Sequence, residues 1–315
     1  MSDLEMAATS ELGVRPLTDP GAPPGPAAAA RTRSLAGDAW YDLRRNWIFW
    51  VAAALVLLVI LMAVAPGLFS SADPNACNTR RQFAGPSGGA FFGYDFQGCD
   101  VFSRTVHGAR ASVLVGVFAV LMTGVIGLVF GMVAGYFGGW LDALLSRVVD
   151  VVLGIPLLLA AIVLSKRLSA DRQGSGIATV VIVLGILGWT TAARVMRSSV
   201  LAARSQDYVA AARMLGAGPL RIMWRHILPN ALAPFIVVLT IALGTFIATE
   251  ATLSFLNIGL RPPAISWGID ISTAGKHVRE AAMPLIAPSL FLTLTVLAFI
   301  MLGDAIRDAF DPKLR

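Results

Sequence analysis

Long apolar runs alternate with shorter polar stretches along most of this chain. The first run, Ile48 to Phe69, would be about 33 Å long as an α-helix, which is enough to cross the hydrocarbon core of a bilayer. Later runs have similar length and few charged residues. Together they predict six membrane-spanning helices, over residues 48–69, 111–137, 143–164, 177–196, 229–256 and 284–303.

The composition agrees with a polytopic membrane protein. Hydrophobic residues make up 56% of the 315 residues and charged residues 14%, whereas a soluble domain carries about 25% charged residues. A soluble globular protein, a collagen and a disulfide-rich scaffold are therefore excluded. The net charge of +6 is not gathered into a basic patch interleaved with aromatics, so we expect a lipid bilayer, and no nucleic acid, as a partner.

The arginines predict the orientation. With the N-terminus inside, most Lys and Arg residues fall in cytoplasmic segments. Several lie just before the first span, where basic residues have the strongest effect on membrane orientation. Six spans then place both termini in the cytoplasm. Residues 1–36 are rich in Pro, Ala and Gly and predict a disordered cytoplasmic tail, which leaves 37–315 as the membrane domain.

Motifs for chemistry are missing from the sequence. It contains no G-x-x-x-x-G-K-[ST], no H-E-x-x-H, no C-x-x-C and no G-x-S-x-G. The histidines, His107, His226 and His277, are scattered. We therefore expect no enzyme activity and no cofactor or metal in this chain.

Glycines in the second predicted span recur every four residues, at Gly127, Gly131 and Gly135. This spacing puts them on one helix face, where a neighbouring helix can approach closely. Packing is the expected role, and lining a ligand site is the alternative.

Three acidic residues fall within or at the ends of predicted spans. We expect Asp150 to pair with Arg147, three residues earlier on the same helix. Asp304 lies at a span end. Glu250 is inside the fifth span, so it predicts either an interhelical hydrogen bond or a proton-coupling site.

The two cysteines, Cys77 and Cys99, both lie in the external stretch 70–110. That compartment permits disulfides, and two unpaired thiols there would be reactive. We expect a disulfide, with two free exposed thiols as the alternative.

A distinctive segment between the fourth and fifth spans reads DYVAAARMLGAGPLRIMWRHILPN. It predicts a helix over Asp207–Met214, a break at Gly216 and Gly218, and a second short helix from Pro219. The residues alone also permit an amphipathic loop held at the lipid surface by its arginines.

This segment resembles the EAA loop of ABC importer permeases. Ala211 and Ala212 stand at the two alanine positions, Gly216 has the required spacing, and Leu228-Pro229 close the pattern; Ala210 replaces the usual Glu. The stretches GCDVFSRTVHGARASVLVG, EATLSFLNIGLRPPAISWG and LGDAIRDAFDPKLR extend the resemblance over about 40–315. They are similar to the dipeptide/oligopeptide/nickel branch of that family.

The resemblance implies an all-α, type I ABC importer permease in the plasma membrane of a bacterium, carrying peptides or peptide-like solutes. It implies a path formed with a second, different permease. It also implies two ATP-binding subunits or one fused ATPase, which bind ATP-Mg, and an extracytoplasmic solute-binding protein. Residues 205–229 would be the ATPase-coupling loop, with Ala211, Ala212, Gly216, Leu228 and Pro229 as its site residues.

The rival class is a secondary transporter driven by an ion gradient. It would require a midplane cluster of acids or broken helices, and the sequence offers only Glu250 for that role.

Overall fold

The computed structural model describes residues 35–169 and 176–310. A compact unit begins at Ala39. The predicted tail, 1–36, lies outside the described residues except for its last two. The helices are α1 (Leu35–Leu43), α2 (Trp47–Val64), α3 (Val101–Phe137), α4 (Gly139–Leu153), α5 (Leu157–Ser169), α6 (Ile177–Arg204), α7 (Asp207–Met214), α8 (Pro219–Ile222), α9 (Leu228–Phe255), α10 (Trp267–Ala274) and α11 (Met283–Phe310).

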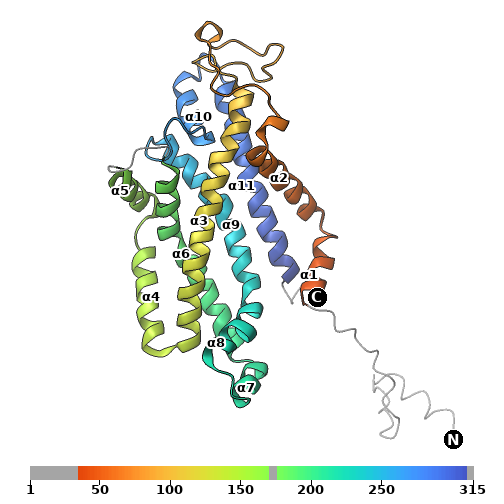
Figure 1. Ribbon diagram of the computed structural model, residues 1–315, viewed down its shortest axis with the longest axis vertical. Helices are drawn as coiled ribbons and strands as arrows, with labels where there is room; N and C mark the ends of the chain where they lie inside the picture. Colours follow the sequence, from red (N-terminus) through yellow and green to blue (C-terminus); the bar gives the residue numbers. More distant parts are fainter. Residues whose placement is uncertain (1–34, 170–175, 311–315) are drawn as a thin grey trace, which may run out of the picture. The chain divides into compact units, whose positions relative to one another are not determined.

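The long helices α3, α6, α9 and α11 run side by side, and α2 packs along α11 and α3 (Figure 1). Among the described residues, α2, α3, α6, the continuous α8–α9 stretch and α11 are long and apolar enough to cross a bilayer. The bent pair α4–α5 is a sixth candidate. Helix α11 runs toward the end of the unit that carries α7 and α8, and α2 runs away from it (Figure 1). The arginines assign that end to the cytoplasm.

Two predicted spans differ from the observed helices. Residues 101–110, predicted as part of the external loop, form the first turns of α3. The cause is Asp100, whose carboxylate accepts hydrogen bonds from the backbone N–H groups of Phe102 (2.8 Å) and Ser103 (3.2 Å) and so caps the helix.

The predicted third span, 143–164, is not one helix. It breaks between Leu153 and Leu157, and the axes of α4 and α5 differ by 85°. Pro156 accounts for the break, because proline lacks the N–H that would continue the ladder and disfavours helical backbone at Ile155 before it. Gly154 adds a residue of low helix propensity.

The predicted glycine face of α3 packs against α6, as expected. A Cβ atom on Gly127 would lie 2.7 Å from Ala192 Cβ, and one on Gly131 would lie 2.6 Å from Met196 Cβ. Both distances are shorter than real carbon contacts. The two backbones therefore approach so closely that only glycine fits.

Glu250 makes the expected interhelical hydrogen bond. It is fully buried, and its carboxylate accepts bonds from the hydroxyls of Ser112 on α3 and Ser254 on α9, each at 2.8 Å. The Ser254 hydroxyl in turn accepts a bond from Leu260 N at 2.9 Å. The cluster ties α3, α9 and the segment after α9 together.

Asp150 does not pair with Arg147. Its carboxylate lies 2.6 Å from Arg194 Nη2 on α6. The prediction considered only neighbours on the same helix, whereas α4 folds back against α6 and brings a closer cation. One turn toward the cytoplasm, Arg197 of α6 binds Asp142 of α4 through two hydrogen bonds.

We predict that Gly131→Val destabilises the protein by about 1–3 kcal/mol or more, because the added carbons collide with the α6 backbone at Ala193. Thermal unfolding of the detergent-solubilised protein measures the effect. Val129→Ala, at an exposed site on the same helix, is the control and should leave the midpoint nearly unchanged. Equal midpoints for the two variants would show that the α3–α6 contact is loose.

Candidate functional site

The segment between α6 and α9 forms a helical hairpin, α7 and α8, at the cytoplasmic end of the unit (Figure 1). Helix α7 occupies Asp207–Met214, as the sequence predicts. Asp207 lies in its first turn, where a negative charge is favourable, and Arg213 lies in its last turn.

The end of α7 is fixed by backbone hydrogen bonds around Gly216. Ala217 N donates to Ala212 O at 3.0 Å, and Gly216 N donates to Arg213 O at 2.9 Å. This pair of bonds is a Schellman motif, which requires a left-handed residue at its centre. Gly216 has φ +79°, with no atom within 4 Å of the position of a Cβ. Glycine is therefore favoured at position 216 because of the left-handed backbone conformation, and not because a side chain would lack space.

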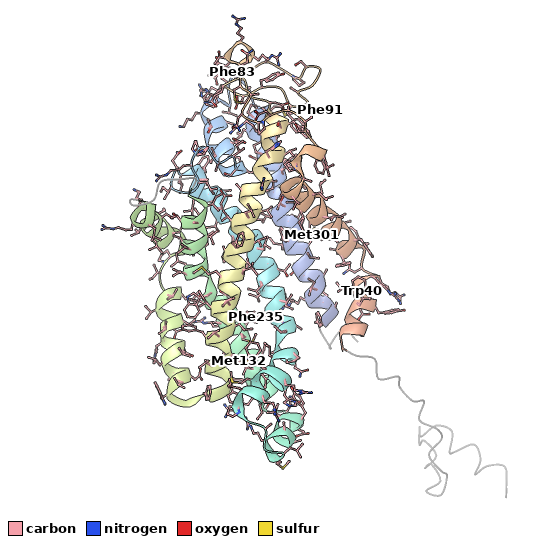
Figure 2. The ribbon with its side chains drawn as sticks, viewed as in Figure 1. Trp40, Phe83, Phe91, Met132, Phe235 and Met301 are labelled. Carbon is pink, nitrogen blue, oxygen red and sulfur yellow. A yellow bond between two sulfur atoms is a disulfide. The ribbon has the colours of Figure 1, made fainter. Side chains whose placement is uncertain are left out.

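The two alanines of the loop face opposite ways. Ala212 is buried and packs with Val209, Ile222 and Ile227 in one apolar cluster, whereas Ala211 is exposed. The cluster continues into the bundle through Met132 of α3 and Phe235 of α9, which are labelled in Figure 2. Helix α7 is therefore held against its own bundle on one side and is free on the other.

The free side of the hairpin carries large apolar side chains. Four of them are strongly exposed, and we call this set the apolar knob: Met214, Leu215, Leu220 and Trp224. Arg213, Arg221 and Arg225, which neighbour these residues along the chain, are exposed too. Large exposed apolar side chains on one segment are typical of a surface that docks onto another protein.

The second short helix, α8, begins at Pro219 as predicted, and Leu228-Pro229 begin α9. Helix α8 continues into α9 through a π-helical turn, Met223–Ile227. Pro229 has no N–H to donate, and the wider turn just before it keeps the helix continuous. Leu228 itself is buried in the apolar cluster, and Pro229 is exposed.

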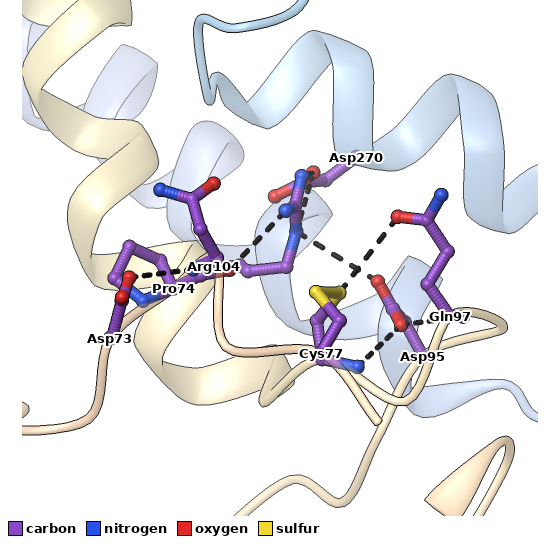
Figure 3. Close-up of a disulfide and its surroundings, with 9 residues drawn as sticks. Asp73, Pro74, Cys77, Asp95, Gln97, Arg104 and Asp270 are labelled. Atoms are coloured by element: carbon purple, nitrogen blue, oxygen red, sulfur yellow. Dashed lines mark hydrogen bonds and ion pairs between the residues drawn. A yellow bond between two sulfur atoms is a disulfide. The ribbon is translucent and has the colours of Figure 1, made fainter. Parts of the chain in front are cut away.

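At the other end of the unit, the external loop is joined to the helices by a disulfide and an ionic cluster (Figure 3). Cys77 is bonded to Cys99, and Cys99 N donates to the Asp95 carboxylate at 2.8 Å. Arg104 of α3 lies between Asp95 and Asp270 of α10 and donates from Nε to Asp270 at 3.1 Å. Burial raises the pKa of the Asp270 carboxyl, and the Arg104 guanidinium opposes that shift.

Within 35–169 and 176–310, no group of three or more His, Cys, Asp or Glu side chains is arranged to hold a metal ion. His107, His226 and His277 lie on different elements; His277 stacks on Phe96 of the external loop, with ring centroids 5.1 Å apart.

Residues 127–315 match the family described as the binding-protein-dependent transport system inner membrane component. The chain belongs to this family. Residues 34–86 also match the N-terminal transmembrane domain of oligopeptide transport permease C. The chain is therefore a multi-pass permease of the bacterial inner membrane and is not an enzyme in its own right.

Similar proteins include a dipeptide transport system permease of Alkalihalophilus pseudofirmus, 36% identical over 88% of this chain and 90% of that protein. An oligopeptide transport system permease of Bacillus subtilis is 36% identical over 90% and 92%. A glutathione transport system permease of Pectobacterium atrosepticum is 37% identical over 88% and 90%.

The fold is also similar to that of solved ABC transporters. An inward-facing MetNI methionine transporter matches with a TM-score of 0.50 and 21% identity, over 65% of this chain and 96% of that one. At this identity the likeness concerns the fold alone, and it agrees with the predicted importer permease architecture.

The sequence did not identify the apolar knob as a surface. Its residues are interspersed with arginines and small residues, so the sequence predicted a helix–turn–helix and also permitted an amphipathic loop at the lipid surface. The available signal was Met214-Leu215 directly before Gly216: a left-handed glycine ends α7 there and projects the preceding side chains outward.

We predict that Cys77 and Cys99 are bonded in the exported protein. A closed loop with a sequence separation of 22 stabilises the fold by roughly 3 kcal/mol in the chain-entropy model. Intact-mass analysis after alkylation checks this: the denatured protein should take up alkyl groups only after reduction. Two alkylated cysteines without reductant would contradict the pairing.

Proposed function

We propose that this chain is one of two different permease subunits of an ATP-driven peptide importer. Its relatives include permeases for dipeptides, oligopeptides and glutathione, and each match extends over nearly the whole chain. In this proposal a solute-binding protein delivers a peptide-like cargo, and partner ATPase subunits bind ATP-Mg.

The observation that carries the proposal is the hairpin of α7 and α8. A chain without a P-loop must receive its power stroke mechanically, and the apolar knob offers an ATPase groove a protruding surface of fixed shape. The buried side of the hairpin, through Val209 and Ala212, shares an apolar cluster with α3, α6 and α9. A movement of the ATPase would thus pass into the membrane helices as a rigid-body change.

The structure gives little support to the rival hypothesis, a transporter driven by an ion gradient. Its candidate proton site, Glu250, is engaged by two serine hydroxyls and is fully buried. The break between α4 and α5 satisfies one criterion for a secondary transporter, but it is equally suited to a cargo path in an importer.

The first test uses the backbone of Gly216. Gly216→Val should lower peptide-stimulated ATP hydrolysis by about tenfold or more, because a β-branched residue is strained at φ +79° and displaces the knob. Gly216→Asn is the matched control and should keep most of the activity, since Asn tolerates this conformation. The assay is ATP hydrolysis by the reconstituted complex, with the membrane yield of each variant measured in parallel.

The second test uses the knob itself. Leu215→Glu changes a side chain that is 87% exposed, so it should leave membrane insertion intact. It should release the ATPase subunits on co-purification, because a charge would be buried in their groove. Ala212→Glu is unsuitable for this purpose, since Ala212 faces its own bundle. Near-normal stimulated hydrolysis in both Gly216→Val and Leu215→Glu would contradict coupling and favour a lipid-surface loop.

A further inference from the structure

One face of α6 is polar where a lipid-facing helix would be apolar. Thr191, Arg194 and Ser198 follow one another at spacings of three and four residues, so they form a stripe, and all three are exposed. Threonines are exposed on other membrane-spanning helices as well, for example Thr252 on α9, so the charge of Arg194 is what sets this stripe apart. A charged side chain on a spanning helix is costly against hydrocarbon.

Arg194 strengthens this argument. Its side chain is 56% exposed and its partner Asp150 is 50% exposed, although the two charges lie 2.6 Å apart. Arg194 lies two residues before the end of the predicted span 177–196, so the pair lies near the cytoplasmic surface. A half-exposed ion pair needs water or polar groups beside it, because hydrocarbon solvates neither charge.

A hollow of about 450 Å³ adjoins the stripe. The break between α4 and α5 forms one wall, with Leu153 and Pro156, and α6 and α9 form the others. Its lining is mainly apolar, but the hydroxyl-bearing Thr191 of α6 and Thr245 of α9 are exposed on it. Mostly apolar walls with a few hydroxyls, at this volume, are typical of a site for a small organic molecule.

The hollow and the ion pair are neighbours. Thr191 lines the hollow, whereas Arg194, three residues further along α6, lines a second hollow together with Asp150 and Arg197. When the site is empty, Asp150 and Arg194 neutralise each other. Because both are half exposed, each can also face a ligand: the guanidinium suits a carboxylate, and the carboxylate suits an ammonium group.

We propose that the hollow and the Arg194–Asp150 pair together form the subsite at which this subunit holds a short zwitterionic peptide on its way across the membrane. The uncharged part of the peptide occupies the hollow beside Thr191 and Thr245. Its terminal carboxylate and ammonium groups exchange with the ion pair. This inference rests on the proposed function, which it deepens by naming the residues that meet the cargo.

The test compares cysteine variants of the complete complex in nanodiscs. Thr191→Cys places a thiol in the hollow, and Leu121→Cys places one on an exposed apolar site of α3. A charged, water-soluble methanethiosulfonate should modify Thr191→Cys about tenfold faster than Leu121→Cys, because thiolates form and react in water and not in lipid. Saturating trialanine, added without ATP, should slow that reaction at least about threefold, whereas N-acetyl-trialanine amide should not.

Arg194→Gln supplies a second measurement. In proteoliposomes it should raise the KM for trialanine uptake by about tenfold, the equivalent of one lost charge-assisted hydrogen bond. ATPase subunits should remain bound, and Arg194→Lys should restore part of the affinity.

Two results would overturn the proposal. Equal labelling of Thr191→Cys and Leu121→Cys would show that lipid or the second permease covers this face. Fast labelling without protection by trialanine would show a hydrated face that holds no peptide. Failure of the proposed function is a separate result: it would appear as loss of ATP-driven uptake by the wild-type complex, whereas the labelling needs no ATP.

Discussion

The close contact between α3 and α6 determines how the rest of the unit is arranged. Gly127, Gly131 and Gly135 let α6 approach so near that a Cβ at any of them would overlap an atom of α6. This contact fixes the rotation of α6 about its own axis. With Met196 and Val200 turned toward α3, the opposite stripe is exposed, and the end of α6 is positioned to start the α7–α8 hairpin.

The same constraint connects the two functional surfaces. The apolar cluster that anchors α7 includes residues of α3, α6 and α9, and the hollow at the α4–α5 break is lined by α6 and α9 as well. A shift of the hairpin would therefore reach the hollow through helices that belong to both. If the hairpin receives the mechanical input and the hollow meets the cargo, as proposed, the two sites share structural elements.

The sequence predicted the elements that depend on local patterns. Long apolar runs, the glycine spacing on α3 and the bounds of α7 each follow from nearby residues. It failed where the answer depended on distant parts of the chain. Asp150 had a cation on its own helix, and only the folding of α4 against α6 makes Arg194 the nearer partner. Ala211 and Ala212 are equivalent in hydropathy, and the docking of α7 decides which one is buried. Pro156 lies within an apolar run, and membrane helices tolerate proline often enough that the break was not predictable.

The π-helical turn before Pro229 makes the stretch Pro219–Phe255 one continuous helix of 37 residues, about 55 Å long. A helix of this length can move as one rigid element, which begins at the cytoplasmic hairpin and ends beyond the middle of the bilayer. If it pivots about its far end, each degree of tilt moves its tip by about 1 Å. A modest displacement of the hairpin would then turn the part of α9 that lines the hollow through a small angle. The residues of α9 at the hollow would move less than the hairpin does.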